Sequence, residues 1–180
     1  SHLLFAMGAE AAAFSAFRRA LLAEGVSEMI LLPTLLRTAS GGRPLDFQVA
    51  FGLSNLPVAE AVASVALITC FLLDGDQGGD VRRKNLTAAG VPATHILQLP
   101  KGKAIEDMIE RSQYLEVVND YLTEIGIDRI GDRDLARDLT VAKAVDEFVK
   151  RNRGLPNGVG HKVIATRLAQ LGGNIRLAPR

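Results

Sequence analysis

The feature that most constrains the fold is a nearly continuous apolar run at residues 66–73, bounded by Asp74, Gly75 and Asp76. A short apolar run that ends in turn residues is typical of a central strand buried on both faces of a parallel sheet. Such a strand needs other strands beside it and a helical layer on each face. The rest of the chain must therefore supply those layers.

The flanking sequence has the alternation that this requirement predicts. Strand-like runs are expected at residues 19–23, 46–51, 66–73 and 94–99. Helical segments are expected before and between them, at residues 9–19, 27–38 and 57–64, and after a Gly-rich loop at 76–80 up to about residue 89. The alternation of strands and helices predicts an α/β fold with a parallel sheet of about four strands flanked by helices.

Beyond residue 104 no strand-like run occurs, and helical periodicity dominates. Helices are expected over residues 105–109, 114–125, 135–149 and 161–171. We therefore expect an α/β core over residues 1–104 and a helical annex over 105–153. A basic C-terminal segment, residues 154–180, is expected to pack back toward the active site.

Composition excludes several classes of protein. The single cysteine, Cys70, allows neither a disulfide framework nor a cysteine-based zinc site. The longest uncharged apolar run, residues 61–73, is far shorter than the roughly 20 residues that cross a bilayer. We therefore expect a cytoplasmic protein with no membrane partner.

The net charge of +1 hides an uneven distribution. Residues 151–180 carry six basic side chains and no acidic one, which leaves 15 basic and 20 acidic residues in the first 150. An acidic body with a basic tail is compatible with a polyanionic substrate if the acids bind cations.

Acidic residues follow three of the four predicted strands. They are Glu24 and Glu28 after the first, Asp74 and Asp76 after the third, and Glu106 after the fourth. Ligands of parallel sheets bind at the carboxyl ends of the strands, so these carboxylates are expected to converge there. Each acid alone suits a helix-capping or solvated role, but the set in order predicts a site for Mg²⁺, Mn²⁺ or Ca²⁺. Two such ions can activate water for phosphodiester cleavage, and Asp74 is best placed to bridge them.

The segments around these acids resemble the Toprim fold of topoisomerases, primases and several nucleases. The fuller pattern resembles the nuclease region of the OLD (overcoming lysogenisation defect) family. It comprises Leu-Leu-Ala-Glu-Gly-Val-Ser-Glu at 21–28, Leu-Leu-Asp-Gly-Asp-Gln-Gly at 72–78 and Leu-Pro-Lys-Gly-Lys-Ala-Ile-Glu-Asp at 99–107.

The resemblance implies a metal-dependent DNA endonuclease or nickase with a two-metal mechanism. Mg²⁺ or Mn²⁺ would support the reaction, and Ca²⁺ would be a non-productive substitute. The implied metal ligands are Glu24, Glu28, Asp74, Asp76 and Glu106. The expected partners are DNA, an N-terminal ABC-type ATPase domain and further copies of the full-length protein.

The ATPase domain itself is not expected in this chain, because no Walker A sequence occurs in it. The Ser1-His2 start resembles the remnant of a tag. Both features predict that the chain is an excised C-terminal region of a larger protein.

A downstream lysine is implied to assist catalysis, together with Glu24 and Asp74. Lys162 opens the last predicted helix, where a cation is unfavourable to the helix dipole, so we expect it to meet the scissile phosphate. Lys101 and Lys103 compete for that role. The candidate DNA contacts are Arg82, Arg83, Lys101, Lys103, His161 and Arg167.

Three other functions remain open. A Toprim ribonuclease or primase-like enzyme would act on RNA, and a non-catalytic dimerisation or regulatory module would keep only the fold. A phosphatase of the haloacid-dehalogenase type also uses Asp-x-Asp, but at the end of its first strand, whereas Asp74 ends the third predicted strand here.

Overall fold

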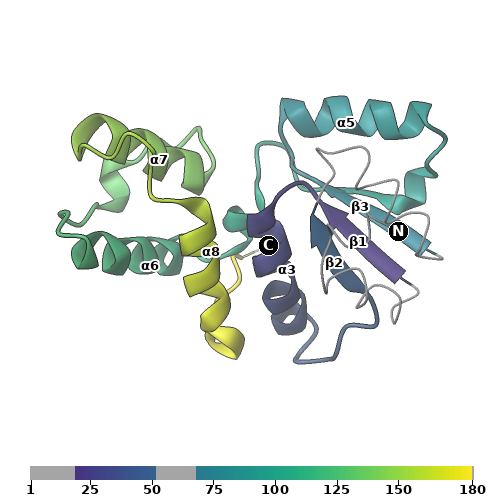
Figure 1. The fold of residues 1–180 in the computed structure, drawn as a ribbon, viewed down its shortest axis with the longest axis horizontal. Helices are drawn as coiled ribbons and strands as arrows, with labels where there is room; N and C mark the ends of the chain where they lie inside the picture. Colours follow the sequence, from purple (N-terminus) through teal and green to yellow (C-terminus); the bar gives the residue numbers. More distant parts are fainter. Residues whose placement is uncertain (1–18, 52–67, 180) are drawn as a thin grey trace, which may run out of the picture.

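The computed structural model describes residues 19–51 and 68–179 (Figure 1). The predicted helix at 57–64 lies outside these residues, as does almost all of the one at 9–19. The core elements are β1 (Arg19–Ala23), α3 (Val26–Ala39), β2 (Gln48–Phe51), β3 (Ile68–Leu73), α5 (Gln77–Ala88) and β4 (Ile96–Gln98). The annex contains α6 (Arg111–Glu124) and α7 (Val141–Asn152), and from here on the name also covers α8 (His161–Gln170) of the predicted C-terminal segment.

The four strands form one parallel sheet in the order β2-β1-β3-β4. In register, Leu21 of β1 lies opposite Val49 of β2 and Cys70 of β3, and Phe71 lies opposite Ile96 of β4. The predicted α/β class and parallel sheet are therefore confirmed. Because all four strands run the same way, their carboxyl ends meet at one edge of the sheet.

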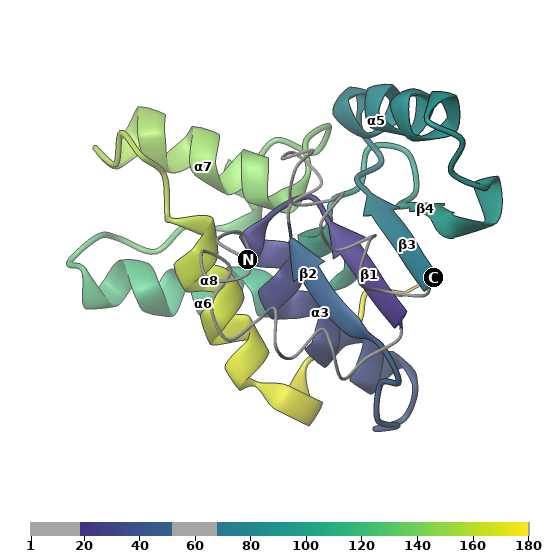
Figure 2. The same ribbon diagram turned by 45° about the vertical axis from the view of Figure 1, so that its right-hand side comes forward.

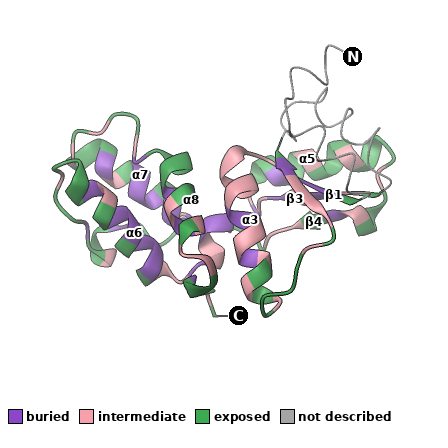
Figure 3. Ribbon diagram, turned by 60° about the horizontal axis from the view of Figure 1, so that its bottom comes forward, coloured by how far each residue is buried: buried purple, intermediate pink, exposed green. Residues whose placement is uncertain are grey.

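Helices pack against the sheet, and further helices lie to one side of it (Figures 1 and 2). The helix α3 packs on β1 and β2, and α5 packs on β3 and β4. The annex helices lie beyond α3, and α8 packs along it. One hydrophobic cluster of buried residues includes Leu21 in the sheet, Leu31 of α3 and Leu168 of α8. Buried positions occur in the sheet, in α3 and in the annex helices (Figure 3). The annex therefore shares a core with the sheet.

Four predicted elements differ from the observed ones. Residues 77–80, predicted as part of a Gly-rich loop, form the first turn of α5, because the Asp76 carboxylate caps that helix by accepting a hydrogen bond from the Gly79 amide at 2.9 Å. The helix predicted over 135–149 begins only at Val141, because the Thr140 hydroxyl accepts a hydrogen bond from the Lys143 amide at 3.4 Å and caps it there. The strand predicted over 94–99 is shortened by a 3₁₀ turn, η1 (Ala93–His95). The segment predicted as a helix over 105–109 is a single 3₁₀ turn, η2 (Ile105–Met108).

No helix within residues 19–51 and 68–179 is both long enough and apolar enough to cross a bilayer.

A close backbone contact joins the Asp74-Gly75-Asp76 turn to the loop after β4. The Gly75 amide donates to the Lys103 carbonyl at 2.9 Å, and the Gly102 amide donates to the Gly75 carbonyl at 2.7 Å. A Cβ atom at residue 75 would lie 1.8 Å from the Pro100 carbonyl oxygen. Only glycine therefore allows the ends of β3 and β4 to approach each other in this way.

We predict that Gly75→Ala lowers the free energy of unfolding by at least about 2 kcal/mol, because the added methyl group overlaps immobile backbone. Chemical denaturation measures this loss. Gly173→Ala is the matched control, since a Cβ atom there meets nothing within 4 Å. Equal stabilities for the two variants would contradict the prediction.

Candidate active site

The acids that follow the strands meet at the carboxyl edge of the sheet. We call Glu24, Glu28, Asp74, Asp76 and Glu106 the acidic edge. Burial raises the pKa of Asp74 to about 7, with further increases from the charges of the other four acids. The fold therefore places the other four predicted metal ligands close enough to Asp74 for their charges to raise its pKa.

Glu24 links the ends of β1 and β3. Its Oε1 accepts a hydrogen bond from the Asp74 amide at 3.2 Å, and its Oε2 lies 2.6 Å from Nη1 of Arg82 on α5. The Glu24 side chain is only 14% exposed, so this ion pair is well shielded from water. Arg82, a predicted DNA contact, thus neutralises an acid of the site in this structure.

The two carboxylate oxygens of Asp76 have different partners. Its Oδ1 caps α5 by accepting from the Gly79 amide at 2.9 Å, and this bond is the main reason its pKa is lowered. Its Oδ2 lies 3.3 Å from Nζ of Lys143, which comes from α7. The annex therefore contributes a cation to the acidic edge.

Glu28 and Glu106 are the more deeply placed acids. Glu106 is 8% exposed in the 3₁₀ turn η2, and Glu28 lies in the first turn of α3. Burial is the main cause that raises the pKa of each carboxyl group. Glu28 raises the pKa of Glu106 further, whereas the charge of His161 lowers the pKa of both.

Asp107, the neighbour of Glu106, has a purely structural set of bonds. Its Oδ2 accepts from the Ala104 amide and its Oδ1 from the Val141 amide, each at 2.9 Å. It therefore caps the start of α7 and ties the annex to the loop that carries Glu106.

The acidic edge offers only carboxylate oxygens as side-chain ligands. Carboxylate oxygens are the ligands that Mg²⁺ and Mn²⁺ prefer, and the excess negative charge of the edge favours them. Within the described parts of the chain, however, no three His, Cys, Asp or Glu side chains are close enough to share one ion. The carboxylates are the type of ligand that these ions need. In this structure Arg82 and Lys143 neutralise part of the negative charge that bound ions would neutralise.

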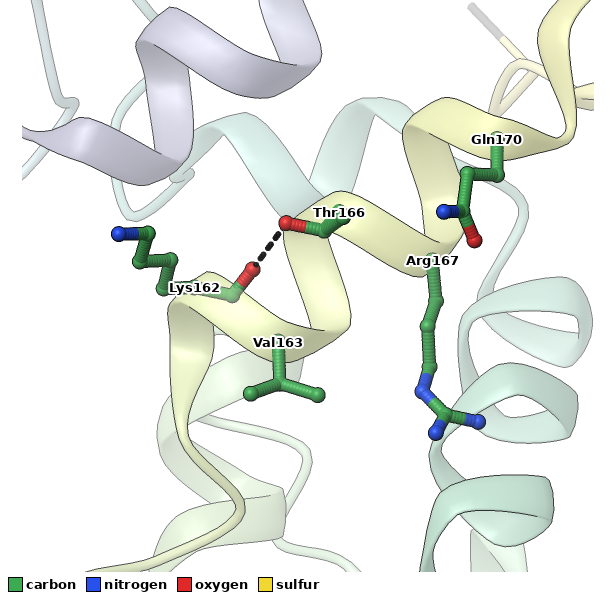
Figure 4. A pocket seen from close by; sticks show the side chains of 5 residues that line it. All are labelled: Lys162, Val163, Thr166, Arg167 and Gln170. Carbon is green, nitrogen blue, oxygen red and sulfur yellow. Dashed lines mark hydrogen bonds between the residues drawn. The ribbon is translucent and has the colours of Figure 1, made fainter.

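Two predicted basic site residues of the C-terminal segment, Lys162 and Arg167, lie on α8. Lys162 and Arg167 line an open cavity of about 520 Å³ with Val163, Thr166 and Gln170 (Figure 4). Arg167 makes a bidentate ion pair with Glu124 of α6, at 2.7 and 2.5 Å, and lies over the Tyr121 ring. DNA binding by Arg167 would have to compete with Glu124.

The remaining candidates are dispersed around the acidic edge. Lys101 and Lys103 are exposed in the loop between β4 and η2, and Arg83 donates to the Gln98 side chain at 3.2 Å. His161 begins α8, and its Nε2 lies 2.7 Å from Oδ2 of Asp146 on α7.

Sequence reasoning missed three residues of this region. Lys143 carries no local signal, because only the packing of α7 brings it to Asp76. Gln98 donates to the Asp74 carbonyl at 3.2 Å and to Asp80 at 2.9 Å, which is equally a product of tertiary contact. Asp146 did have a signal: it shares a helical face with Ala142 and Val149, where an acid needs a partner.

No protein-family model and no curated protein sequence matches the chain. The fold does match solved structures. The C-terminal region of the Xanthomonas campestris pv. campestris OLD protein superposes with a TM-score of 0.53 at 16% identity, over 86% of this chain and 84% of that one. The C-terminal region of the Burkholderia pseudomallei OLD protein gives 0.52 at 14% identity, over 87% and 88%.

This chain has the fold of an OLD C-terminal region. Its four-stranded parallel sheet with flanking helices also agrees with the Toprim-type fold. At such low identity the likeness establishes architecture only, and a shared architecture supports many functions. The chemistry therefore has to be argued from the acidic edge.

The raised pKa of Asp74 predicts a pH-dependent cost in the metal-free protein. The unfolded chain ionises this group near pH 3.8, whereas the folded protein does so near pH 7. Stability should thus fall as pH rises between these values and stay reduced above them. Asp74→Asn removes the charge, so it should raise the melting temperature at pH 8 in EDTA by several degrees, and by little at pH 4.

Asp76→Asn is the matched control. The pKa of Asp76 is lowered by its bond to the Gly79 amide, so its charge stabilises the fold at pH 8 and the variant should melt lower than wild type. A destabilised Asp74→Asn protein at pH 8 would contradict the repulsion inferred at the acidic edge.

Proposed function

We propose that the chain is a metal-dependent nuclease domain that hydrolyses phosphodiester bonds of DNA. The observation that carries the proposal is the convergence of five carboxylates from β1, α3, β3 and β4 loops, which leaves Asp74 with a pKa of about 7. A protein gains nothing in stability from such a cluster, so a bound cation is the simplest physical reason for it.

Glu24, Glu28, Asp74, Asp76 and Glu106 would hold the two divalent ions, Mg²⁺ or Mn²⁺. When bound, such ions supply a hydroxide nucleophile at neutral pH and stabilise the charge of the leaving oxygen. The chain's own residues have other tasks. The acidic carboxylates orient the site, and cations on α8 attract and hold the phosphate backbone.

The ion pairs seen at the edge suit this function. Arg82 and Lys143 neutralise Glu24 and Asp76, and both are long, flexible cations that can exchange a carboxylate for a phosphate. Incoming metal ions would release these two side chains toward the DNA. Arg82, Arg83, Lys101, Lys103 and Arg167 thus remain proposed backbone contacts.

In the larger protein, the domain would act beside an N-terminal ABC-type ATPase domain and within a homo-oligomer. The solved structures that share this fold are themselves C-terminal regions of OLD proteins, which supports this placement.

We predict that Asp74→Ala abolishes Mg²⁺- or Mn²⁺-dependent cleavage of plasmid DNA, because the acid at the centre of the edge is lost. The folded state should survive, as judged by circular dichroism. Asp80→Asn is the matched control, since Asp80 is exposed on α5 and bonds only Gln98 in the described contacts. Full cleavage by Asp74→Ala would refute the mechanism, and preferential cleavage of matched RNA would move the substrate to RNA.

We further predict that Lys162→Ala slows cleavage about 100-fold, with metal affinity unchanged, because a cation facing the phosphate acts mainly in the transition state. Lys101→Ala and Lys103→Ala should each slow it less than about tenfold. Single-turnover kinetics with calorimetric titration of Mn²⁺ distinguishes these effects. The largest loss in Lys101→Ala or Lys103→Ala would transfer the role to that lysine.

One observation favours a non-catalytic module. In residues 19–51 and 68–179, no three potential ligands lie close enough to share an ion. Calorimetry decides between the two functions: a nuclease domain binds Mn²⁺ or Ca²⁺ through the acidic edge, and the Asp74→Ala variant loses that binding. An absence of heat with every divalent ion would support the regulatory module.

A further inference from the structure

Asp146 is an acid on the buried side of α7, only 9% exposed. Its Oδ2 lies 2.7 Å from Nε2 of His161 and 3.8 Å from Nζ of Lys150. Its Oδ1 accepts a hydrogen bond from the Val159 amide at 3.1 Å. Burying a carboxylate is costly without such partners, so these bonds define the position of the group.

The loop before α8 is shaped around this carboxylate. A Cβ atom at Gly158 would lie 2.3 Å from Oδ1 of Asp146, and Gly158 has a φ of 72°. Gly160, with a φ of 74°, then leads into the helix without a side-chain cap. Asp146 therefore determines where α8 begins and where His161 lies.

His161 begins α8, which packs along α3, the helix whose first turn carries Glu28 of the acidic edge. The charge of His161 lowers the pKa of Glu28 and of Glu106 in η2. The hydrogen bond to Asp146 is the main cause that raises the pKa of His161 itself, and Lys150 opposes it. Lys162 follows directly on the same helical turn.

We propose that Asp146 is a positioning residue that holds His161 through its Nε2, so that the imidazole presents its Nδ1–H to a phosphate oxygen beside the acidic edge. The proposal rests on the nuclease function proposed above and deepens it. The pair places a cationic donor beside five acids, where a phosphodiester needs one. Because Nε2 is taken by Asp146, Nδ1 is the nitrogen left to donate.

The kinetic test compares wild type with Asp146→Asn, His161→Gln and the double variant. Each single change should slow DNA cleavage about 10- to 100-fold, since a partner that orients an active-site histidine has an effect of this size. The double variant should be no slower than the slower single variant. Glu147→Gln is the matched control: this neighbouring acid on α7 pairs with Arg151 and is 48% exposed.

A readout independent of cleavage is the NMR titration of the His161 ring. In wild type the ring should titrate above its ordinary pKa of 6.5 and shift when a short DNA duplex is added in Ca²⁺. In Asp146→Asn the titration should move to lower pH, as should the alkaline limb of the cleavage profile. A purely structural Asp146 would leave the alkaline limb of the cleavage profile unchanged, even though the ring itself titrates at lower pH.

The outcomes separate this inference from the proposed function. Wild-type cleavage by His161→Gln, or a His161 ring signal insensitive to DNA, would overturn the inference while leaving the nuclease intact. Full cleavage by Asp74→Ala would instead refute the nuclease mechanism, and the DNA-dependent shift of the His161 ring would still test the pair. Should Asp146→Asn fail to fold, His161→Gln decides alone, because that side chain is 44% exposed.

Discussion

Repulsion among carboxylates at one edge of a parallel sheet is the constraint on which the rest of this structure depends. Parallel strands end together, so acids that follow successive strands are forced into proximity. The effect is visible in Asp74, whose pKa is raised to about 7 by burial and by four neighbouring acids. Such a site persists only because the surrounding elements hold it against that repulsion.

The annex provides much of what holds it. Lys143 of α7 pairs with Asp76, and Asp107 joins η2 to the start of α7. The helix α8 packs on α3, and the charge of His161 at its start lowers the pKa of Glu28 and of Glu106. The cations that neutralise the acids thus come from both parts, Arg82 from α5 of the core and Lys143 from α7 of the annex. A continuous hydrophobic core joins the sheet to the annex, so neither part forms the site alone.

The backbone arrangement and the chemistry of this chain rest on different observations. The likeness to OLD C-terminal regions establishes how the backbone is arranged, at 14–16% identity. The proposed function rests instead on the buried acids and on the cations that pair with them. A nuclease function is consistent with both, because a polyanionic substrate needs a site that binds cations and a surface that carries them.

Much of this was available from the sequence alone. The apolar run before Asp74 and the alternation around it determined a parallel sheet, and the acids after the strands determined which edge carries the candidate site. Local pattern determines these features because strand burial and strand ends depend on nearby residues. Tertiary structure alone decided the partners: Arg82 on Glu24, Lys143 on Asp76, and Asp146 on His161. Those pairs join residues 58, 67 and 15 positions apart, and only the packing of helices on the sheet and on one another brings them within hydrogen-bonding distance.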